Sequence, residues 1–355
     1  MLAALYCNPE DLRLEQTPLP PIGAGELLLQ VRAAGVCGTD LRIWHGGHRK
    51  FSPGTRRILG HEVVGEIAQC GEGTPGFQPG QVVFVAPNMG CGRCVQCLTG
   101  YNNRCADYAA LGITLDGGFA EWMRVPAAAV QQGNIIPLAP DVDLAAAALI
   151  EPFACVLHGQ DALHIQPGEV VLVIGAGPIG LMHAKLARLR GARRVVISEP
   201  LAERRLLAAR AGADRLVDPL HEDLPAIVRQ ESGGLGADAI IVAAPSHQAQ
   251  EQALQLAAIG GRINFFGGLP KDRPLIQFDS NLVHYKELIV TGTTACSTND
   301  CRRAAELVNA GRIDLRDLVS QRFPLSQAPA AFAAAEDRKS LKIVIEPGLL
   351  EGTSS

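Results

Sequence analysis

The chain has 355 residues, of which 47% are hydrophobic and 19% are charged, and its formal net charge at pH 7 is −4. This composition is typical of a folded globular protein, and the slight negative charge gives no electrostatic basis for binding nucleic acid. The length predicts two domains, at roughly 150 residues per domain. The longest apolar stretch, residues 170–182, is too short for a membrane helix, which needs about 18 apolar residues, so no membrane contact is expected.

Up to residue 150 the chain contains short β-rich runs separated by Gly and Pro, at residues 26–33, 63–70 and 81–86 among others. Such runs predict a β-rich domain made of short strands.

From residue 151 to about residue 287, strand and helix patterns alternate. Strands are expected at residues 170–174, 194–198, 215–217, 239–243 and 262–266, and helices at 178–190, 201–211, 224–231 and 248–258. This alternation predicts a parallel sheet with helices on both faces.

The last part of the chain, residues 288–355, contains a helix pattern at 298–310 and a strand pattern at 341–345. It is too short to bury a large core alone, so we expect it to complete the first domain. Residues 352–355 are expected to be disordered.

Four of the ten cysteines form the pattern C-x2-C-x2-C-x7-C, at Cys91, Cys94, Cys97 and Cys105. Because residues 1–10 show no export signal, this cluster indicates a metal site in a reducing cytoplasm. Four thiolates complete the tetrahedral shell of a structural zinc ion. An iron–sulfur cluster is a weaker alternative, because the bacterial motif has three residues before its fourth Cys and a Pro after it. Disulfides or uncoordinated thiols are the other alternative.

Cys37, His61, Glu62 and Glu151 are candidates for a second zinc site. One thiolate, one imidazole and one or two carboxylates leave a coordination position for water or substrate, as in catalytic zinc sites. Each residue alone is weak evidence, because a single Cys or His is more often buried without a metal. The prediction depends on their occurrence together with a dinucleotide signature.

That signature is Gly175-Ala-Gly-Pro-Ile-Gly180, a G-x-G-x-x-G motif between an expected strand and an expected helix. Gly175 is expected to allow a tight turn, Gly177 a close approach of the pyrophosphate, and Gly180 close packing of helix and strand. Pro178 and Ile179 begin the helix, whose N-terminus would face the phosphates.

The second strand of this domain ends at Glu199. A carboxylate there can accept hydrogen bonds from the ribose hydroxyls of the cofactor and would repel a 2′-phosphate, which favours NAD over NADP. Arg204 and Arg205 leave NADP open, because a nearby arginine can bind that phosphate. A solvated strand end is the alternative for Glu199.

With these motifs, the sequence resembles the zinc-containing medium-chain dehydrogenases over nearly its whole length. Within them it is most similar to the polyol branch, which includes the sorbitol (L-iditol) dehydrogenases, and to the threonine dehydrogenases. The matching stretches are Gly35-Val-Cys-Gly-Thr-Asp40, Gly60-His-Glu62, the four-cysteine segment, Asp116-Gly-Gly-Phe-Ala-Glu121, Glu151-Pro-Phe and the glycine motif.

The resemblance implies an α/β protein with two domains. The first, residues 1–150 and 288–355, would be a GroES-like catalytic domain with a structural zinc lobe at residues 88–108. The second, residues 151–287, would be a Rossmann NAD-binding domain with a doubly wound parallel sheet. The resemblance also implies two zinc ions per subunit and a homo-oligomer, either a dimer or a tetramer.

The resemblance further implies that Cys37 and His61 bind the catalytic zinc. Glu62 and Glu151 match two carboxylates that bind it directly or through water, and which of them is the third ligand is left open. Asp40 would orient His61 through a hydrogen bond.

Thr39 takes the position of the hydroxyl that relays the substrate proton, although a turn residue that bonds its own backbone is an alternative. Three residues later Arg42 stands where many relatives have His, so a proton exit through that His is unavailable. His45, His48 or water molecules are candidate substitutes, and the sequence does not choose among them.

The expected reaction is oxidation of a secondary alcohol, first of all a polyol or sugar alcohol, to a ketone with hydride transfer to NAD. β-Hydroxy amino acids and sugar phosphates are alternative substrates. Basic residues at 48–50 and 56–57 would either attract an anionic substrate or form a solvated loop. Two other functions are an NADPH-dependent carbonyl reductase, against which Glu199 argues, and a non-catalytic zinc protein that binds nucleotide, which has no use for an open zinc site.

Overall fold

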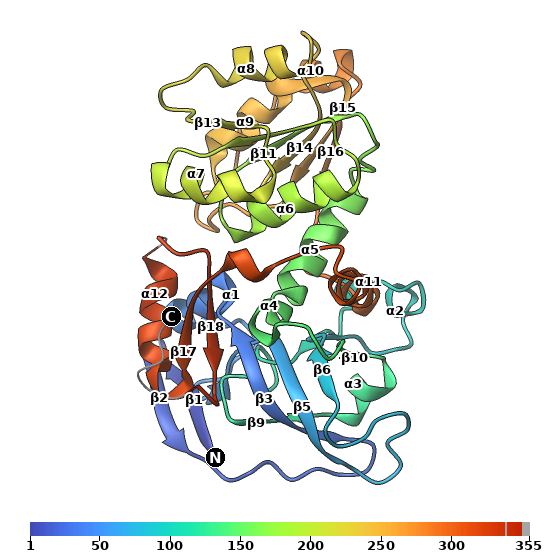
Figure 1. Ribbon diagram of the computed structural model, residues 1–355, viewed down its shortest axis with the longest axis vertical. Coiled ribbons are helices and arrows are strands. Elements are labelled where there is room, and N and C mark those ends of the chain that lie inside the picture. The colour runs from blue at the N-terminus through green and yellow to red at the C-terminus, as the bar shows by residue number, and fades with distance from the viewer. Residues whose placement is uncertain (338, 350–355) are drawn as a thin grey trace. The chain divides into compact units, whose positions relative to one another are not determined.

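The computed structural model describes residues 1–337 and 339–349, and the chain forms two units (Figure 1). The first unit comprises Met1–Ala154 and Cys296–Ser355, and the second comprises Cys155–Ala295. The sequence predicts that the first domain resumes at residue 288, but the structure differs. Strand β16 (Ile289–Gly292) pairs in parallel with β15 (Ala257–Phe265), so the second unit extends beyond that residue. The tail at residues 352–355 lies outside the described residues.

A mixed sheet forms the centre of the first unit, in the order β10-β6-β5-β3-β18-β17, with β9 paired to β3. Its strands are β3 (Leu27–Gly35), β5 (Glu62–Cys70), β6 (Val82–Val85), β9 (Trp122–Val125), β10 (Ile135–Pro137), β17 (Val319–Pro324) and β18 (Lys342–Glu346). Strand β18 pairs with β3 in antiparallel register, so that Val344 lies opposite Gly35. A strand from the C-terminal part of the chain therefore lies beside the segment that leads to Cys37.

Two smaller sheets and several helices complete this unit. The small strands are β1 (Leu2–Asn8), β2 (Asp11–Gln16), β4 (Arg57–Ile58), β7 (Asn88–Met89) and β8 (Ala109–Ala110). The helices are α1 (Gly38–Gly46), α2 (Val95–Leu98), α3 (Ala127–Gln131), α4 (Leu144–Ala148), α11 (Thr298–Asn309) and α12 (Ala328–Glu336), with 3₁₀ turns at Asn102–Arg104, Arg316–Leu318 and Leu325–Gln327. Phe332 of α12 is fully buried and packs edge-on against Phe119, which fixes α12 on the core.

The second unit contains a six-stranded sheet in the order β13-β12-β11-β14-β15-β16, and all of its neighbouring strands are parallel. The remaining strands are β11 (Val170–Ile174), β12 (Arg194–Ser198), β13 (Arg215–Val217) and β14 (Ala237–Val242). The helices are α6 (Pro178–Leu189), α7 (Ala202–Ala208), α8 (Leu224–Glu231), α9 (His247–Leu256) and α10 (Ser280–Tyr285), with a 3₁₀ turn at Ala209–Ala211. Helix α5 (Ile150–Asp161) begins in the first unit and ends in the second.

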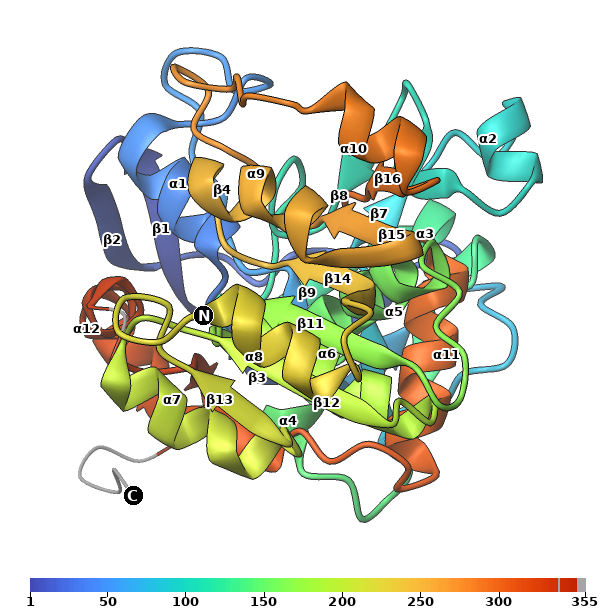
Figure 2. The same ribbon diagram turned by 90° about the horizontal axis from the view of Figure 1, so that it is seen from above.

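In Figure 1 helices α8, α9 and α10 lie above this sheet and α6 and α7 lie below it, and Figure 2 shows the same strands from above. Strand β11 is buried along its whole length, which explains its continuous run of branched residues. The strand order corresponds to 3-2-1-4-5-6, which confirms the predicted doubly wound sheet. Among the described residues, no helix combines the length and the apolar character needed to cross a membrane.

Candidate metal centres and dinucleotide site

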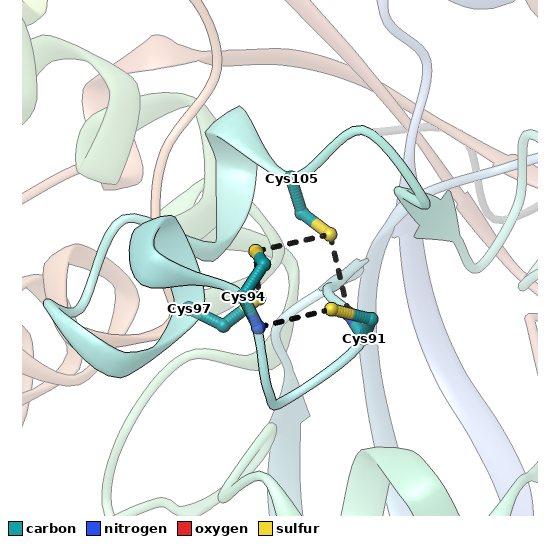
Figure 3. A group of neighbouring side chains, drawn as sticks. All are labelled: Cys91, Cys94, Cys97 and Cys105. Carbon is teal, nitrogen blue, oxygen red and sulfur yellow. Dashed lines mark hydrogen bonds between the residues drawn. The ribbon is translucent and has the colours of Figure 1, made fainter.

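The four-cysteine segment folds around the short helix α2 and the Asn102–Arg104 turn. The sulfur atoms of Cys91, Cys94, Cys97 and Cys105 all lie within 4.8 Å of one another and face a common centre (Figure 3). Cys94 Sγ lies 3.6 Å from Cys97 Sγ and 3.8 Å from Cys105 Sγ. A tetrahedron with zinc–sulfur bonds of about 2.3 Å has sulfur–sulfur edges of about 3.8 Å, whereas a disulfide bond is about 2 Å long. The arrangement therefore fits a zinc ion and not a pair of disulfides.

Backbone amides of this segment point at the sulfur atoms. The amide of Cys94 donates to Cys91 Sγ at 3.4 Å, and the amide of Cys91 donates to Cys105 Sγ at 3.3 Å. Amide donors from Arg93 and Cys94 lower the pKa of Cys91 to about 6, while burial raises the pKa of Cys97 to about 12. Without a cation, the four sulfurs cannot all be thiolates at neutral pH, so a bound metal would satisfy this donor set.

Cys37, His61 and Glu62 meet at one end of the mixed sheet. Cys37 is the residue before α1, His61 is the residue before β5, and Glu62 is the first residue of β5. Their ligand atoms lie within 4.8 Å of one another, and His61 and Glu62 are buried. A thiol, an imidazole and a carboxylate at this spacing fit a zinc ion.

Asp40 lies between Cys37 and His61 and contacts both. Its Oδ2 accepts a hydrogen bond of 2.9 Å from the Cys37 amide, and its Oδ1 lies 3.4 Å from His61 Nδ1. Burial opposes the charged form of His61, but the negative charges of Asp40 and Cys37 outweigh burial and raise its pKa. His61 Nδ1 makes no well-formed hydrogen bond although it is buried. An imidazole held in this way is suited to an incoming cation that would draw it into place.

Lys342 of β18 is a member of this site that the sequence analysis missed. Its Nζ donates to both carboxylate oxygens of Glu62, to Oε2 at 2.6 Å, and also to the Val36 carbonyl at 3.2 Å. Burial opposes the charge on Lys342, but Glu62 and then Cys37 outweigh it and raise its pKa. The available signal was a single lysine in the apolar run Leu341–Ile345, where burial without a partner is rare.

Gly35 provides the space for this ion pair. A Cβ atom on Gly35 would lie 2.0 Å from Glu62 Oε2. The first glycine of the Gly35–Asp40 motif is therefore explained by the carboxylate that lies against it.

Glu151, in the first turn of α5, is not part of the Cys37, His61 and Glu62 group. Its carboxylate Oε1 lies 3.8 Å from Cys296 Sγ, and it is close enough to Lys342 to help raise the pKa of that lysine. The structure thus brings three of the four predicted catalytic-zinc residues together and leaves Glu151 beside them.

Thr39 lies two residues after Cys37 in α1, and Arg42 lies one turn further along. The Arg42 guanidinium donates to Thr39 Oγ1 through Nη2 at 2.8 Å. His45, a candidate for proton exit, is instead held between Glu10 and Glu336. The side-chain hydrogen bond to Glu10, followed by that to Glu336, raises the pKa of His45.

The glycine motif forms the turn between β11 and α6 in the second unit. Gly175 has φ +107, which favours glycine, and a Cβ atom on Gly180 would lie 1.9 Å from the Gly175 carbonyl oxygen. Gly177 is the residue before α6, Pro178 is the first residue of the helix, and Ile179 follows it. The turn leaves the backbone amides at the start of α6 open for a phosphate group.

Glu199 follows β12 and is buried, so it is not a solvated strand end. Its Oε2 accepts a hydrogen bond of 2.7 Å from the Ala176 amide, and its Oε1 accepts one of 3.0 Å from the Leu201 amide. The carboxylate thus braces the glycine turn. Arg204 Nη1 lies 3.6 Å from the position of a Cβ on Gly177, so a guanidinium also borders the turn.

Known proteins resemble the chain over both units. The model of the alcohol dehydrogenase GroES-like domain matches residues 23–136, and that of the zinc-binding dehydrogenase matches residues 178–310. The L-galactonate-5-dehydrogenase of Escherichia coli K12 is 36% identical, covering 91% of this chain and 92% of that protein. The 2-dehydro-3-deoxy-L-galactonate 5-dehydrogenase of Pseudoalteromonas atlantica is 33% identical over 98% of each chain. The L-threonine 3-dehydrogenase of Caldanaerobacter subterraneus subsp. tengcongensis is 31% identical, with coverages of 95% and 96%.

Solved structures give the same picture. A zinc-binding dehydrogenase from Sinorhizobium meliloti 1021 bound to NADP has a TM-score of 0.90 and 32% identity, covering 98% of this chain and 99% of its own. An alcohol dehydrogenase from Escherichia coli CFT073 complexed with NADH has a TM-score of 0.87 and 27% identity, with the same coverages. The two structures carry different nicotinamide cofactors on a closely similar fold.

Proposed function

The chain belongs to the zinc-containing alcohol dehydrogenase family, and from this premise we propose that it oxidises a secondary alcohol of a sugar acid or polyol to a ketone. In this reaction the carbon that bears the hydroxyl loses a hydride to C4 of the nicotinamide, and the hydroxyl loses its proton. The observation that carries the proposal is the group of Cys37, His61 and Glu62, whose ligand atoms lie within 4.8 Å of one another.

Cys37 and His61 would hold the catalytic zinc, with Glu62 or Glu151 as the third ligand. A bound zinc ion would act as a Lewis acid that lowers the pKa of the substrate hydroxyl. Asp40, whose Oδ1 lies 3.4 Å from His61 Nδ1, would orient His61 once the metal is bound. Lys342 offsets the negative charge of Glu62, so the site is less negative than its anionic side chains alone would make it. A less negative site favours ionisation of the alcohol.

Thr39 would receive the alcohol proton. Its oxygen already accepts a hydrogen bond from Arg42, so its own proton is free to be donated onward as the alcohol proton arrives. Arg42 has no acceptor and cannot carry the proton further. His45 is engaged by Glu10 and Glu336, so we infer that water or a cofactor hydroxyl takes the proton from Thr39.

The second unit would bind the dinucleotide, with its pyrophosphate at Gly175–Gly180 and the N-terminus of α6. A nicotinamide cofactor would accept the hydride. The Glu199 carboxylate retains lone pairs for ribose hydroxyls and repels a 2′-phosphate, so NAD is the preferred cofactor, whereas Arg204 would support NADP if the preference is reversed.

Cys91, Cys94, Cys97 and Cys105 would hold a second, structural zinc ion, because four sulfur ligands leave no position for substrate. We place the enzyme in a reducing cytoplasm as a homo-oligomer, a dimer or a tetramer, which light scattering of the purified protein would test.

The experiment is a turnover assay of the zinc-loaded protein with NAD and with NADP, against sugar acids, polyols, β-hydroxy amino acids and sugar phosphates. We expect NADH formation with a sugar acid or polyol, and loss of that activity in Cys37→Ser and after zinc chelation. Cys70→Ser, which changes a half-buried cysteine of β5 outside the site, should retain activity. Activity only in the direction of NADPH-dependent ketone reduction would favour a reductase. Silence with zinc and dinucleotide both shown to be bound would favour a non-catalytic protein.

A further inference from the structure

Arg42 is a cation beside the hydroxyl relay that the proposed reaction does not use as an acid or base. Its side chain is exposed, and its Nη2 donates to Thr39 Oγ1 at 2.8 Å. Among residues 1–337 and 339–349, no carboxylate forms an ion pair with it. A guanidinium carries five N–H donors in a planar fork, and the Thr39 bond uses one of them.

Three other cations expected to attract an anionic substrate are already engaged. Lys50 donates to the Tyr108 carbonyl, Arg56 pairs with Glu15, and Arg57 pairs with Asp116 at 2.9 Å. In the basic segment that the sequence suggested as an anion attractor, the charges of Arg56 and Arg57 are therefore offset by carboxylates. In this part of the chain, Arg42 and the exposed Arg49 are the two arginines that no described carboxylate pairs with.

The position of Arg42 relative to the relay gives it a chemical meaning. An alcohol that passes its proton to Thr39 must bring its reacting hydroxyl within hydrogen-bond distance of Thr39, and the guanidinium bonds that same oxygen. A substrate with a carboxylate a few carbons from the reacting hydroxyl can therefore present it to the free edge of the guanidinium. Guanidinium and carboxylate form paired, charge-assisted hydrogen bonds. The uncharged hydroxyl at the end of an alditol cannot form such a pair.

Building on the proposed function, we propose that Arg42 is a specificity-determining residue that binds the carboxylate of a sugar acid and so selects aldonates over the corresponding alditols. This role also accounts for an arginine at a position where an imidazole would have served proton transfer. Two of the relatives described above act on galactonate or its deoxy derivative, which is the substrate class that this arrangement of charge suits.

The test compares two substrates that differ at one carbon, L-galactonate and galactitol, with the zinc-loaded enzyme and NAD. Arg42→Gln should lower kcat/KM for galactonate by about ten- to one-hundredfold, because it removes a hydrogen-bonded charge pair between enzyme and substrate. Most of this loss should come from a higher KM. The kcat/KM for galactitol should change by less than about threefold, which is the usual effect of a substitution at an exposed position. Arg42→Lys should recover part of the loss, because it restores the charge without the fork.

Arg49→Gln is the matched control, since it removes an exposed arginine of the same segment and should leave both substrates unchanged. Equal losses with galactonate and galactitol in Arg42→Gln would overturn the proposal, because they would assign Arg42 to proton transfer through Thr39. If Arg49→Gln lowered kcat/KM for galactonate as much as Arg42→Gln does, the proposal would also be overturned. The substrate carboxylate would then be attracted by the general positive charge of the segment and not bound by Arg42. A wild-type preference for galactitol would overturn it directly.

A calorimetric titration of galactonate into zinc-loaded protein saturated with NADH separates this inference from the proposed function. Binding that depends on Arg42 without turnover of either substrate would refute the proposed reaction and keep the carboxylate site. Turnover of alditols without Arg42-dependent binding of galactonate would keep the reaction and refute the carboxylate site.

Discussion

At the scale of single residues, the pair of Lys342 and Glu62 is the least expected feature of the site. Both side chains are buried, and the pair joins residues that are far apart in the chain. Breaking a buried ion pair by removing one partner costs about 3–5 kcal/mol, because the remaining charge is left without compensation. Lys342→Met should therefore lower the free energy of unfolding of the zinc-free protein by about that amount.

Urea unfolding measures this effect, and a double variant identifies its cause. Lys342→Met combined with Glu62→Gln should regain most of the loss, because no buried charge then remains unpaired. Lys286→Met is a suitable control, since Lys286 donates to the carbonyls of Gln255 and Ala257 and faces no carboxylate in those bonds. Additive losses in the double variant would show that the two side chains do not act as a pair.

His183, in α6, makes the stability of the second unit depend on pH. Burial, and then the charge of Arg190, lower its pKa to about 3. In the unfolded chain a histidine has a pKa of about 6.5, so below that pH the unfolded state binds a proton that the folded state does not. The free energy of unfolding should fall by up to about 1.4 kcal/mol per pH unit from about pH 6.5 downward.

His183→Gln should remove this contribution. Unfolding of zinc-free wild type and variant, compared between about pH 6.5 and about pH 4.5, should give a difference in stability that narrows as the pH falls. If the free energies of unfolding of wild type and variant changed with pH in parallel over this range, the pH dependence could not be assigned to His183.

At the scale of secondary-structure elements, the four-cysteine segment has little apolar packing around its helix. Helix α2 has four residues and none is buried, and its Val95 and Leu98 side chains are 69% and 73% exposed. An element without a core depends on its metal for order. Removing zinc from this segment should increase amide exchange across residues 88–108 while β11 and β12 stay protected, as measured by hydrogen exchange with mass spectrometry.

Cys97→Ser provides the genetic version of this experiment, because it removes one sulfur of the cluster. Its exchange pattern should match that of the chelated wild type within this segment. Unchanged protection of residues 88–108 after verified loss of zinc would mean that the segment is ordered by its hydrogen bonds alone.

Strands and helices could be predicted from the sequence where burial gives them a regular pattern of hydrophobic residues. Strands β11, β12 and β13 and helix α8 were predicted with the bounds that the structure gives, because buried parallel strands are runs of branched residues and their helices alternate with them. Strand β2 was missed because its side chains are only partly buried or exposed. Helix α7 ends earlier than predicted, because the chain tightens into the Ala209–Ala211 turn before Gly212, which has φ +81.

The same reasoning applies to the site. Cys37, His61 and Glu62 could be predicted because short motifs carry them, and the structure brings their ligand atoms together. Lys342 could not, because its approach to Glu62 depends on the pairing of β18 with β3, which no local pattern encodes. Glu151 was grouped with the zinc ligands from its residue type and from the family resemblance, whereas its carboxylate Oε1 lies 3.8 Å from Cys296 Sγ.

At the scale of the whole molecule, the two proposed binding functions belong to separate units. The residues proposed to hold zinc, from Cys37 to Glu151, lie in the first unit, and the glycine turn, Glu199 and Arg204 lie in the second. Chelation of zinc should therefore abolish turnover while the dissociation constant for NAD changes by less than about twofold, because no residue proposed to bind the dinucleotide belongs to the unit that would hold zinc. Titration calorimetry with NAD, before and after chelation, measures this. A parallel loss of NAD binding would show that the second unit depends on the metal.

The insertion of the second unit into the first also affects the order in which the protein is completed during synthesis. Residues 155–295 emerge from the ribosome as one uninterrupted stretch that contains every strand of its sheet. The sheet of the first unit is completed later, because β3 cannot pair with β18 until residues 342–346 have been made. A nascent chain that has already exposed Cys37, His61 and Glu62 therefore still lacks Lys342, and its metal-binding residues stay without their final neighbour until translation has passed the last strand.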